Sequence, residues 1–371
     1  MEVVVSSDTK LTEILHQIGI CAESVLLTID GNLVPETAIA KKGQTLDILF
    51  YKHVPPFNPQ EPKGHWKKAK YKSCCKFPSV LYLPQTQKHL CKNHFFRLFE
   101  KRVKKTIRTN KMLNKNDRIG IGLSGGKDSY ALLCVLSNLQ QSLPFELVAL
   151  TIDEGIPGYR DKAIENTKQR CKELKIEHHI YSFQKEYNTT IMEIGKKKDN
   201  LCSYCGVLRR KILNSKAREL NLNKLAIGHN LDDVAQTALL NMVRNEPLRI
   251  ARFNEPLIQN QKFIPRIRPF RDIREKEVAA YAFLRGHQYN SGCCCPFSKN
   301  SLRRSIRYKL DSLEDEYPGT KTRIASSFDV FQKLARDSIK EKKIKFCNEC
   351  GEPSSTEQCM SCKMLSALIC P

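Results

Sequence analysis

The sequence has no long apolar run, and it is short of acidic residues. No stretch approaches the ~18 consecutive apolar residues that a membrane-spanning helix needs, which argues against a membrane span. The first ten residues, MEVVVSSDTK, lack the basic and then apolar pattern of a secretory signal peptide. We therefore expect a cytoplasmic protein with no membrane attachment.

The shortage of acidic residues leaves a large positive charge. Among 371 residues, 62 Lys and Arg stand against 39 Asp and Glu, which gives a formal net charge of +23. Such an excess suits a polyanion bound through its phosphates, and nucleic acid is the first candidate partner. A solvated Lys-rich surface would give the same charge, so charge alone leaves both interpretations open.

Cysteine, by contrast, is abundant. The chain has 16 cysteines, and many of them stand as C-x-x-C pairs rather than at scattered spacings. In a reducing compartment such pairs indicate metal or sulfur chemistry more often than structural disulfides.

The first 52 residues predict a small module of strands and one helix. Short β-rich runs lie at 3–5, 25–29 and 45–50, with an amphipathic stretch at 11–18. Asp30-Gly31-Asn32 fits a hairpin turn. This order resembles the β-grasp of the ThiS and MoaD-like carriers, whose free Gly-Gly end becomes a thiocarboxylate. Here the chain continues through Tyr51 and Lys52 without Gly-Gly, which argues against a carrier role for this module.

A longer region, 115–290, alternates strands and helices. Apolar runs at 119–123, 147–152, 179–183 and 225–228 are separated by helical stretches near 128–140, 161–174, 204–220 and 231–244. This alternation predicts an α/β fold with a Rossmann-like parallel sheet and helices on both faces. Such sheets bind ligands at the carboxyl ends of their strands.

A glycine-rich turn follows the first of these strands. Residues 119–129 read IGIGLSGGKDS and join an apolar strand to the start of a helix. Glycines let backbone N–H groups approach phosphate oxygens, and a helix N-terminus adds partial positive charge. The spacing is neither that of a Walker A loop nor that of a dinucleotide fingerprint. The run predicts a phosphate-binding loop made of Gly122, Ser124, Gly125, Gly126, Lys127, Asp128 and Ser129.

SGGKDS is the signature of the PP-loop ATP pyrophosphatases. Four further strings, CSYCG at 202–206, GHNLDD at 228–233, CPF at 295–297 and PGTK at 318–321, occur in order after it. With them, the chain resembles the tRNA 2-thiolation enzymes of the TtuA, NcsA and cytosolic thiouridylase type over about residues 70–365.

This resemblance implies a tRNA-uridine 2-sulfurtransferase. With ATP and Mg²⁺, such an enzyme would adenylate the uridine C2 oxygen and then replace that oxygen with sulfur, at the wobble or the T-loop position. The resemblance places the nucleotide beside Thr151, Asp153 and Gly228. It also implies a separate ubiquitin-like carrier with a C-terminal thiocarboxylate as sulfur donor, and a homodimer.

The resemblance assigns a [4Fe–4S] cluster to Cys202, Cys205 and Cys295. Three thiolates leave one iron without a protein ligand, and that iron can bind sulfide. The residues alone leave two alternatives open: a thioredoxin-like redox pair, and a structural zinc with Cys293 or Cys294 as the fourth ligand.

The resemblance also names Asp233 and Arg209, with Cys202 and Cys205, as the catalytic residues. Asp233 would orient Mg²⁺ or act on the uridine N3 proton, and Arg209 would offset charge during adenylation. The alternative for both residues is an ordinary ion pair near a helix end.

Two more groups predict zinc. Cys347-x2-Cys350 and Cys359-x2-Cys362 form two knuckles with the spacing of a zinc ribbon. Nearer the N-terminus, the half-site Cys91-x2-His94 has only the adjacent pair Cys74 and Cys75 as its partner. Because adjacent thiolates rarely chelate one ion, we expect a distorted or three-ligand zinc site there.

Two basic segments are the predicted tRNA contacts. One lies on a helix from 95 to about 110, and the other follows the CPF string. Their predicted contact residues are Lys101, Arg102, Lys104, Lys105, Arg303, Arg304 and Arg307.

The chain thus divides into six predicted segments: a β-grasp module at 1–52, a basic linker at 53–70, a zinc-finger-like segment with the basic helix at 71–114, the PP-loop core at 115–290, a helical segment at 291–340 and a zinc ribbon at 341–371.

Two rival functions stay open. One is another PP-loop enzyme that modifies tRNA or amidates a substrate, and the other is a non-catalytic tRNA-binding scaffold.

Overall fold

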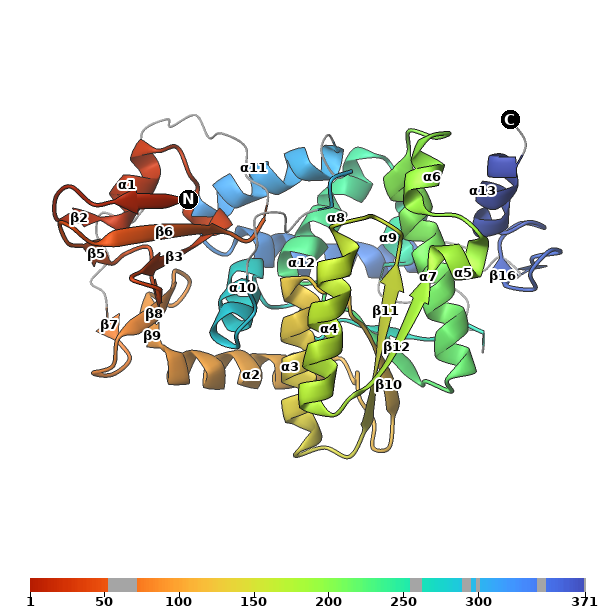
Figure 1. The fold of residues 1–371 in the computed structure, drawn as a ribbon, viewed down its shortest axis with the longest axis horizontal. Coiled ribbons are helices and arrows are strands. Elements are labelled where there is room, and N and C mark those ends of the chain that lie inside the picture. Colours follow the sequence, from red (N-terminus) through yellow and green to blue (C-terminus); the bar gives the residue numbers. More distant parts are fainter. Residues whose placement is uncertain (53–71, 254–261, 289–294, 298–300, 339–344, 370–371) are drawn as a thin grey trace.

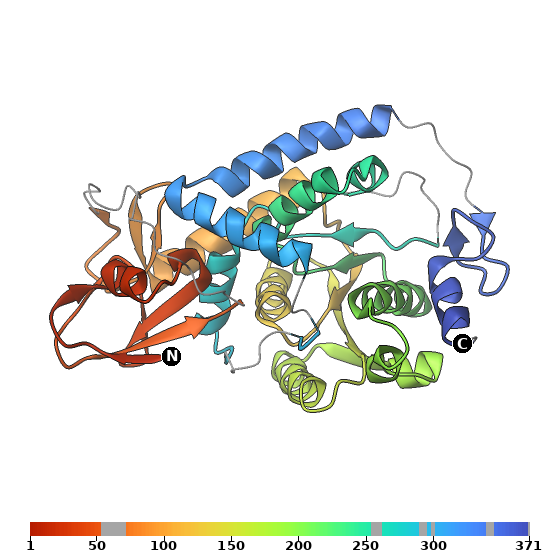
Figure 2. The same ribbon diagram turned by 90° about the horizontal axis from the view of Figure 1, so that it is seen from above.

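The computed structural model describes residues 1–52, 72–253, 262–288, 295–297, 301–338 and 345–369. The predicted linker at 53–70 and the pair Cys293 and Cys294 lie outside these residues. The division of the chain into six segments stays a prediction. The N-terminal module and the C-terminal ribbon lie at opposite ends of the molecule (Figures 1 and 2).

A five-stranded parallel sheet forms the centre of the α/β core. Its strands are β10 (Arg118–Gly122), β11 (Glu146–Asp153), β12 (Glu177–Ser182), β13 (Lys224–Ala226) and β14 (Arg266–Ile267), in the order β12-β11-β10-β13-β14. The predicted parallel sheet is confirmed. Strand β14 was not predicted, because its two residues are too short to give a periodic signal.

Helices cover both faces of the sheet, as predicted. They are α3 (Lys127–Gln140), α4 (Arg160–Leu174), α7 (Leu201–Glu219) and α8 (Leu231–Val243). Strand β11 shows why its whole run is apolar: Leu147 and Ala149 join the core that contains α3, whereas Val148 and Leu150 pack with Ala217 of α7. A strand of a parallel sheet is buried on both faces.

The strand order reverses at β10. Strands β11 and β12 follow β10 on one side of it, and β13 and β14 lie on the other. The loop after β10 and the loop after β13 therefore meet at the carboxyl edge of the sheet, which is where open α/β sheets bind ligands. A Cβ on Gly228 would lie only 3.0–3.1 Å from atoms of Asp128, so the two loops are in close contact.

The N-terminal module is an antiparallel sheet with one helix. Strands β1 (Glu2–Val4), β6 (Thr45–Phe50), β3 (Val25–Ile29) and β4 (Asn32–Val34) pair in that order. Helix α1 (Leu11–Gln17), a short 3-10 turn (Ala22–Ser24) and the pair β2 (Thr9–Lys10) and β5 (Ile39–Ala40) complete it. The predicted strands, helix and turn are confirmed, with Asp30 and Gly31 at positive φ. The β-grasp assignment stays a prediction.

One strand of this module is buried on both sides. All five residues of β3 are buried. Leu27 belongs to the module's own core, whereas Leu26, Leu33 and Tyr51 belong to the same core as the PP-loop strand β10. The module is therefore packed firmly onto the rest of the chain.

A small sheet and a long helix follow. Strands β7 (Lys72–Ser73), β9 (Lys88–Cys91) and β8 (Ser79–Leu83) lead into α2 (Lys92–Thr109). The helix buries Phe95, Phe99 and Val103 at helical spacing, and Phe99 stacks on Tyr281 with ring centroids 4.3 Å apart. The apolar face of α2 fixes the direction in which its basic face points.

The remaining elements are mostly helical. They are α5 (Phe183–Tyr187), α6 (Ile191–Gly195), α9 (Pro247–Ala251), α10 (Glu275–Leu284), α11 (Leu302–Glu316), α12 (Thr320–Asp337), β15 (Lys345–Phe346), β16 (Pro353–Ser354) and α13 (Met360–Ile369). Helix α13 packs against α7, and α12 against α8. Within the described residues, none of these helices has the length and apolarity to span a membrane.

Candidate active site and metal centres

The predicted phosphate loop has the geometry of an anion site. Gly125 has a φ of +82°, and a Cβ there would lie 2.8 Å from the side chain of Ala163, so both the backbone angle and the packing require glycine. Gly126 faces open space, since a Cβ would meet only Ser124 Oγ at 3.6 Å. Helix α3 begins directly after it, at Lys127. Backbone N–H groups at this helix N-terminus are thus accessible to a phosphate.

Ser129 holds the loop in shape. Its hydroxyl accepts a hydrogen bond from Ser124 N at 3.2 Å and donates one to Gly126 O at 3.0 Å. The side chain is buried, so its role in the structure is to stabilise the loop through hydrogen bonds to the loop backbone.

Lys127 is held by two carboxylates. Its Nζ lies 2.8 Å from Asp128 Oδ2 and 2.8 Å from Glu275 Oε1. Burial lowers the pKa of Lys127, but the two carboxylates outweigh burial and raise it well above its usual value. The ammonium stays charged, and two of its three N–H donors are directed at these carboxylates.

A buried cluster of charges lies behind Lys127. Lys321 Nζ bonds Asp232 Oδ1 and Asp311 Oδ1, and Glu275 N donates to Asp232 Oδ2 at 2.8 Å. Lys52 from the N-terminal module joins the same cluster. We call Lys52, Asp232, Glu275, Asp311 and Lys321 the buried charge cluster. The sequence predictions missed it, although Asp232 and Lys321 stand inside the GHNLDD and PGTK strings.

Asp233 occupies a structural position. Asn230 and Asp233 form a capping box at the start of α8, with each backbone N donating to the other side chain at 3.2 Å. Burial raises the pKa of Asp233, and Glu275 adds to the effect. Asn230 Nδ2 also donates to Asp128 Oδ1 at 3.1 Å, so Asn230 contacts the Asp128 carboxylate through its side chain and the Asp233 carboxylate through its backbone N–H. The catalytic role of Asp233 stays a prediction.

Arg209 forms an ion pair, and its catalytic role stays a prediction. Its guanidinium lies 3.3 Å from Glu154 Oε1, and Arg160 lies 2.8 Å from the other oxygen of Glu154. Arg160 also donates to Ser124 O at 2.8 Å. These contacts form a continuous chain from the phosphate loop to α7, which carries Cys202 and Cys205.

The predicted nucleotide contacts lie at the same edge of the sheet. Thr151 is fully buried, and its hydroxyl donates to Leu123 O at 2.9 Å and lies 2.8 Å from His178 Nε2. Asp153 Oδ1 accepts from Gly155 N at 2.9 Å. The side chain of Thr151 thus supports the strand end, and contact of these residues with a nucleotide stays a prediction.

The structure brings the three core cysteines together from distant segments. Cys202 and Cys205 lie in the first turns of α7, and Cys202 Sγ is 3.8 Å from Phe297 O, in the segment of Cys295. Cys205 and Cys295 share one apolar cluster. The three sulfurs are not among the described groups whose ligand atoms all lie within 4.8 Å of one another. A cluster in which each thiolate binds its own iron accommodates sulfurs spaced in this way. The zinc alternative includes Cys293 or Cys294, which lie outside the described residues, and stays open.

Burial raises the pKa of Cys205 to about 11, and the nearby Arg209 offsets this only in part. The redox pair stays open as an alternative, because in a reactive C-x-x-C pair it is the attacking cysteine whose pKa is lowered.

The C-terminal metal group (Cys347, Cys350, Cys359 and Cys362) is closely assembled. Its four sulfurs lie within 4.8 Å of one another, and Cys350 Sγ is 3.7 Å from Cys359 Sγ. Thiolates around one tetrahedral zinc are about 3.8 Å apart, given a Zn–S distance of about 2.3 Å. Backbone N–H groups, above all that of Cys359, lower the pKa of Cys347 to about 6.

The N-terminal metal group (Cys74, Cys75, Cys91 and His94) is also complete. All four ligand atoms lie within 4.8 Å of one another. Cys74 Sγ and Cys75 Sγ are 3.6 Å apart, and Cys91 Sγ is 3.3 Å from His94 Nδ1. The adjacent cysteines point to the same place as the half-site, because β7 and β9 bring them together. The expected zinc, in a distorted or three-ligand site, stays a prediction.

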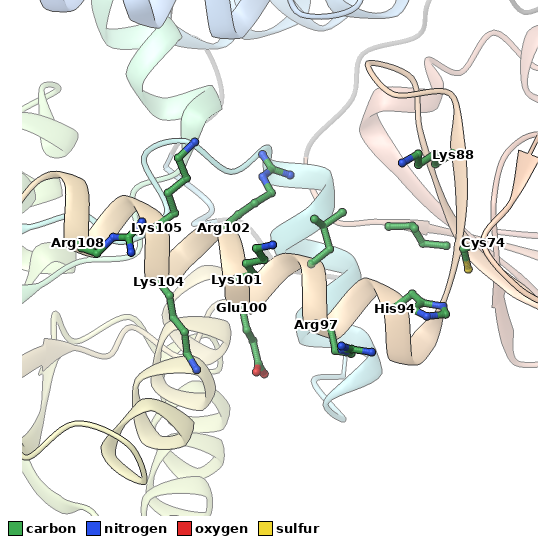
Figure 3. A pocket seen from close by; sticks show the side chains of 12 residues that line it. Cys74, Lys88, His94, Arg97, Glu100, Lys101, Arg102, Lys104, Lys105 and Arg108 are labelled. Carbon is green, nitrogen blue, oxygen red and sulfur yellow. The ribbon is translucent and has the colours of Figure 1, made fainter.

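A basic groove extends from the N-terminal metal group along α2. Its volume is about 1160 Å³. Figure 3 shows the basic side chains distributed along the helix, with Cys74 and His94 at one end of the groove. Lys101, Lys104 and Lys105 are exposed. Arg102, by contrast, forms an ion pair with Glu277 and donates a hydrogen bond to Asp272 O.

The second predicted basic segment lies closer to the active site. Arg303 donates to Thr237 Oγ1 at 3.0 Å, and Arg304 donates to the hydroxyl of Tyr308. Burial lowers the pKa of Arg307, but Glu275 and Asp233 outweigh burial and raise it. Arg307 therefore lies against the buried charge cluster, and its contact with tRNA stays a prediction.

Comparison with known proteins identifies relatives over most of the chain. A family model described as the PP-loop domain matches residues 96–310. The chain is 35% identical to the tRNA 2-thiolation protein NcsA of Haloferax volcanii, over 79% of this chain and 98% of that protein. It is 33% identical to the cytoplasmic tRNA 2-thiolation protein 1 of Xenopus laevis, over 81% of this chain and 88% of that protein.

One solved structure is similar to the chain in both sequence and fold. It is the U34-tRNA thiolase NcsA from Methanococcus maripaludis with its [4Fe-4S] cluster. The TM-score is 0.69 and the identity 33%, over 80% of this chain and 96% of that chain.

Proposed function

Because the chain belongs to the PP-loop family of tRNA 2-thiolation proteins, we propose that it is an ATP-dependent tRNA sulfurtransferase that makes 2-thiouridine. The observation that carries the proposal is the chain of contacts from Ser124 through Arg160, Glu154 and Arg209 to the cysteine helix. It joins a site for ATP phosphates to a site for sulfur chemistry. The names of the relatives favour U34 as the target and a cytoplasmic location.

The first step uses the phosphate loop. The ATP phosphates would lie on residues 124–129, with Lys127 released from a carboxylate to contact them. The uridine C2 oxygen attacks the α-phosphorus, an O–P bond forms, and the bond to pyrophosphate breaks. Asp128 and Asp233, which share Asn230, would hold Mg²⁺ together with the phosphates.

The second step replaces the adenylated oxygen. A sulfur nucleophile attacks C2, the C–O bond breaks, and AMP leaves. When bound to Cys202, Cys205 and Cys295, a [4Fe–4S] cluster would supply an open iron that holds sulfide. Arg209, next to Cys205, would offset negative charge on the sulfur side. A separate carrier with a terminal thiocarboxylate and a homodimer are the further partners that we propose.

The outer metal groups would bind structural zinc. The distances of 3.6 and 3.7 Å between their neighbouring sulfurs suit one tetrahedral ion in each. The groove along α2 would bind the tRNA backbone, because exposed lysines are among the residues that line it.

The decisive experiment uses the full chain, purified without oxygen, with tRNA, ATP, Mg²⁺ and sulfide. Nucleoside mass spectrometry should detect 2-thiouridine that depends on ATP. A Gly126→Val variant should fold, because the site has room for a Cβ, yet its branched side chain should block phosphate binding. This variant should lose pyrophosphate release and keep tRNA binding.

The rival functions predict different results. Pyrophosphate release without 2-thiouridine would indicate another PP-loop reaction, such as amidation. Binding of tRNA without either product would indicate a scaffold. Unchanged pyrophosphate release in the Gly126→Val variant would refute the assignment of the loop.

A further inference from the structure

The last strand of the N-terminal module ends inside the active-site region. Strand β6 runs into Tyr51 and Lys52, which are only 3% and 2% exposed. The Tyr51 hydroxyl donates to Glu23 O, which fixes the ring at the edge of the module. The ammonium groups of Lys52 and Lys127 lie 5.3 and 5.8 Å from the centre of this ring. The module therefore brings a second lysine close to the lysine of the phosphate loop.

Lys52 and Lys127 share one carboxylate. Glu275 Oε1 lies 2.8 Å from Lys127 Nζ, and Glu275 Oε2 lies 3.6 Å from Lys52 Nζ. Lys52 Nζ is also 2.8 Å from Asp311 Oδ2, in an ion pair without a well-directed hydrogen bond. Burial raises the pKa of Glu275, but Lys127, Lys52 and Arg307 outweigh burial and lower it well below its usual range. Glu275 is therefore ionised, and its charge is divided between two lysines.

The start of α10 holds the module in this position. Arg274 pairs with Glu23 at 3.2 Å, and Lys276 pairs with Glu36 at 3.1 Å and donates to Ala22 O at 2.8 Å. All of these side chains are buried. The N-cap residue Arg274 and the helix residue Lys276 thus bind the module on either side of Glu275, which contacts Lys127 of the phosphate loop.

We propose that Lys52 is a positioning residue for ATP, and that the N-terminal module is a fixed part of the ATP site. By neutralising the second oxygen of Glu275, Lys52 weakens the attraction of Glu275 for Lys127 and leaves that ammonium able to move onto the phosphates. Without Lys52, Glu275 would hold Lys127 more tightly, because both side chains are mostly buried and charges interact more strongly there than in water. The inference rests on the proposed binding of ATP at residues 124–129.

The test compares Lys52→Met with Lys52→Arg and with Lys41→Met, an exposed lysine of the same module that pairs with Asp8. The Kd of a non-hydrolysable ATP analogue and the KM and kcat of tRNA-dependent pyrophosphate release would be measured. In Lys52→Met, we expect the Kd and the KM for ATP to rise about tenfold, with kcat nearly unchanged. An effect of about this size is typical of coupling between contacting side chains, here Lys52 and Glu275. Lys52→Arg should restore most of the affinity, and Lys41→Met should match the original protein.

A double variant separates positioning from a general loss of charge or packing. Glu275→Gln removes the carboxylate that restrains Lys127, so Lys52→Met with Glu275→Gln should bind ATP better than Lys52→Met alone. The proposal is overturned if Lys52→Met binds ATP normally, or if the double variant is no better. If Lys52→Met does not fold, Glu275→Gln alone decides: unchanged or tighter ATP binding supports the proposal, and loss of binding refutes it. If the original protein itself does not bind ATP, the proposed function fails instead.

Discussion

The outer metal groups and the core cysteines differ in how their ligands are gathered. Each outer group holds four ligand atoms within 4.8 Å, and each is assembled from knuckles and short strands that are close in sequence. The core cysteines come from α7 and from the separate segment at 295–297, and their sulfurs are spaced more widely. Local hydrogen bonds can assemble a site for one ion, whereas a site for a cluster beside the phosphate loop requires the whole fold.

The largest effect should follow from breaking the core site. Cys205→Ser should abolish 2-thiouridine formation and remove about four irons per chain, while the zinc content stays unchanged. Nucleoside mass spectrometry and elemental analysis of protein prepared without oxygen would measure both. Zinc in place of iron, or full activity in iron-free protein, would contradict the distinction between the core and outer sites.

The C-terminal metal group should affect stability more than chemistry. Cys347→Ser should remove one zinc and make residues 345–369 sensitive to protease, because ligand thiolates hold this small module together. The main thermal transition should move by no more than about 4 °C, since the ribbon packs at the edge of α7. Limited proteolysis and calorimetry would test this. Loss of iron in this variant would show that the two sites are not independent.

The N-terminal metal group should affect tRNA binding. Helix α2 begins directly after Cys91, so the metal group sets the start of the basic groove. Cys75→Ser should lose zinc and weaken tRNA affinity severalfold, whereas Cys347→Ser should leave the affinity unchanged. Zinc retained in Cys75→Ser would indicate a three-ligand site without Cys75. Zinc titration and tRNA binding in the same preparations would decide.

The smallest effect is expected from a single lysine of the groove. Lys104→Ala should reduce the slope of log affinity against log salt by about one unit if Lys104 contacts a phosphate. Lys10, an exposed lysine of the N-terminal module outside the groove, is the matched control, because Lys10→Ala should leave the slope unchanged. Equal slopes for Lys104→Ala and the unsubstituted protein would indicate a merely solvated face.

Much of the core could be predicted from the sequence, because its signals are local. The apolar runs, the glycine turn and the cysteine spacings each lie within a short stretch, and the structure has the predicted strands and helices at these places. Asp233 shows the limit of this approach. The GHNLDD string pointed to a carboxylate, but it did not show that Asp233 would cap a helix while its neighbour Asp232 joined the buried charge cluster.

The sequence by itself determined the periodicity of the core, the phosphate loop and the cysteine groups, since these depend on neighbouring residues. Only the tertiary structure decided that adjacent Cys74 and Cys75 complete a four-ligand group, because β7 and β9 must pair first. It also decided that Lys52 meets Glu275 beside the phosphate loop. Lys52 follows an ordinary strand, and no local pattern marks it. Its role depends on a buried ion pair between distant segments, and such a pair exists only when packing excludes water from both charges.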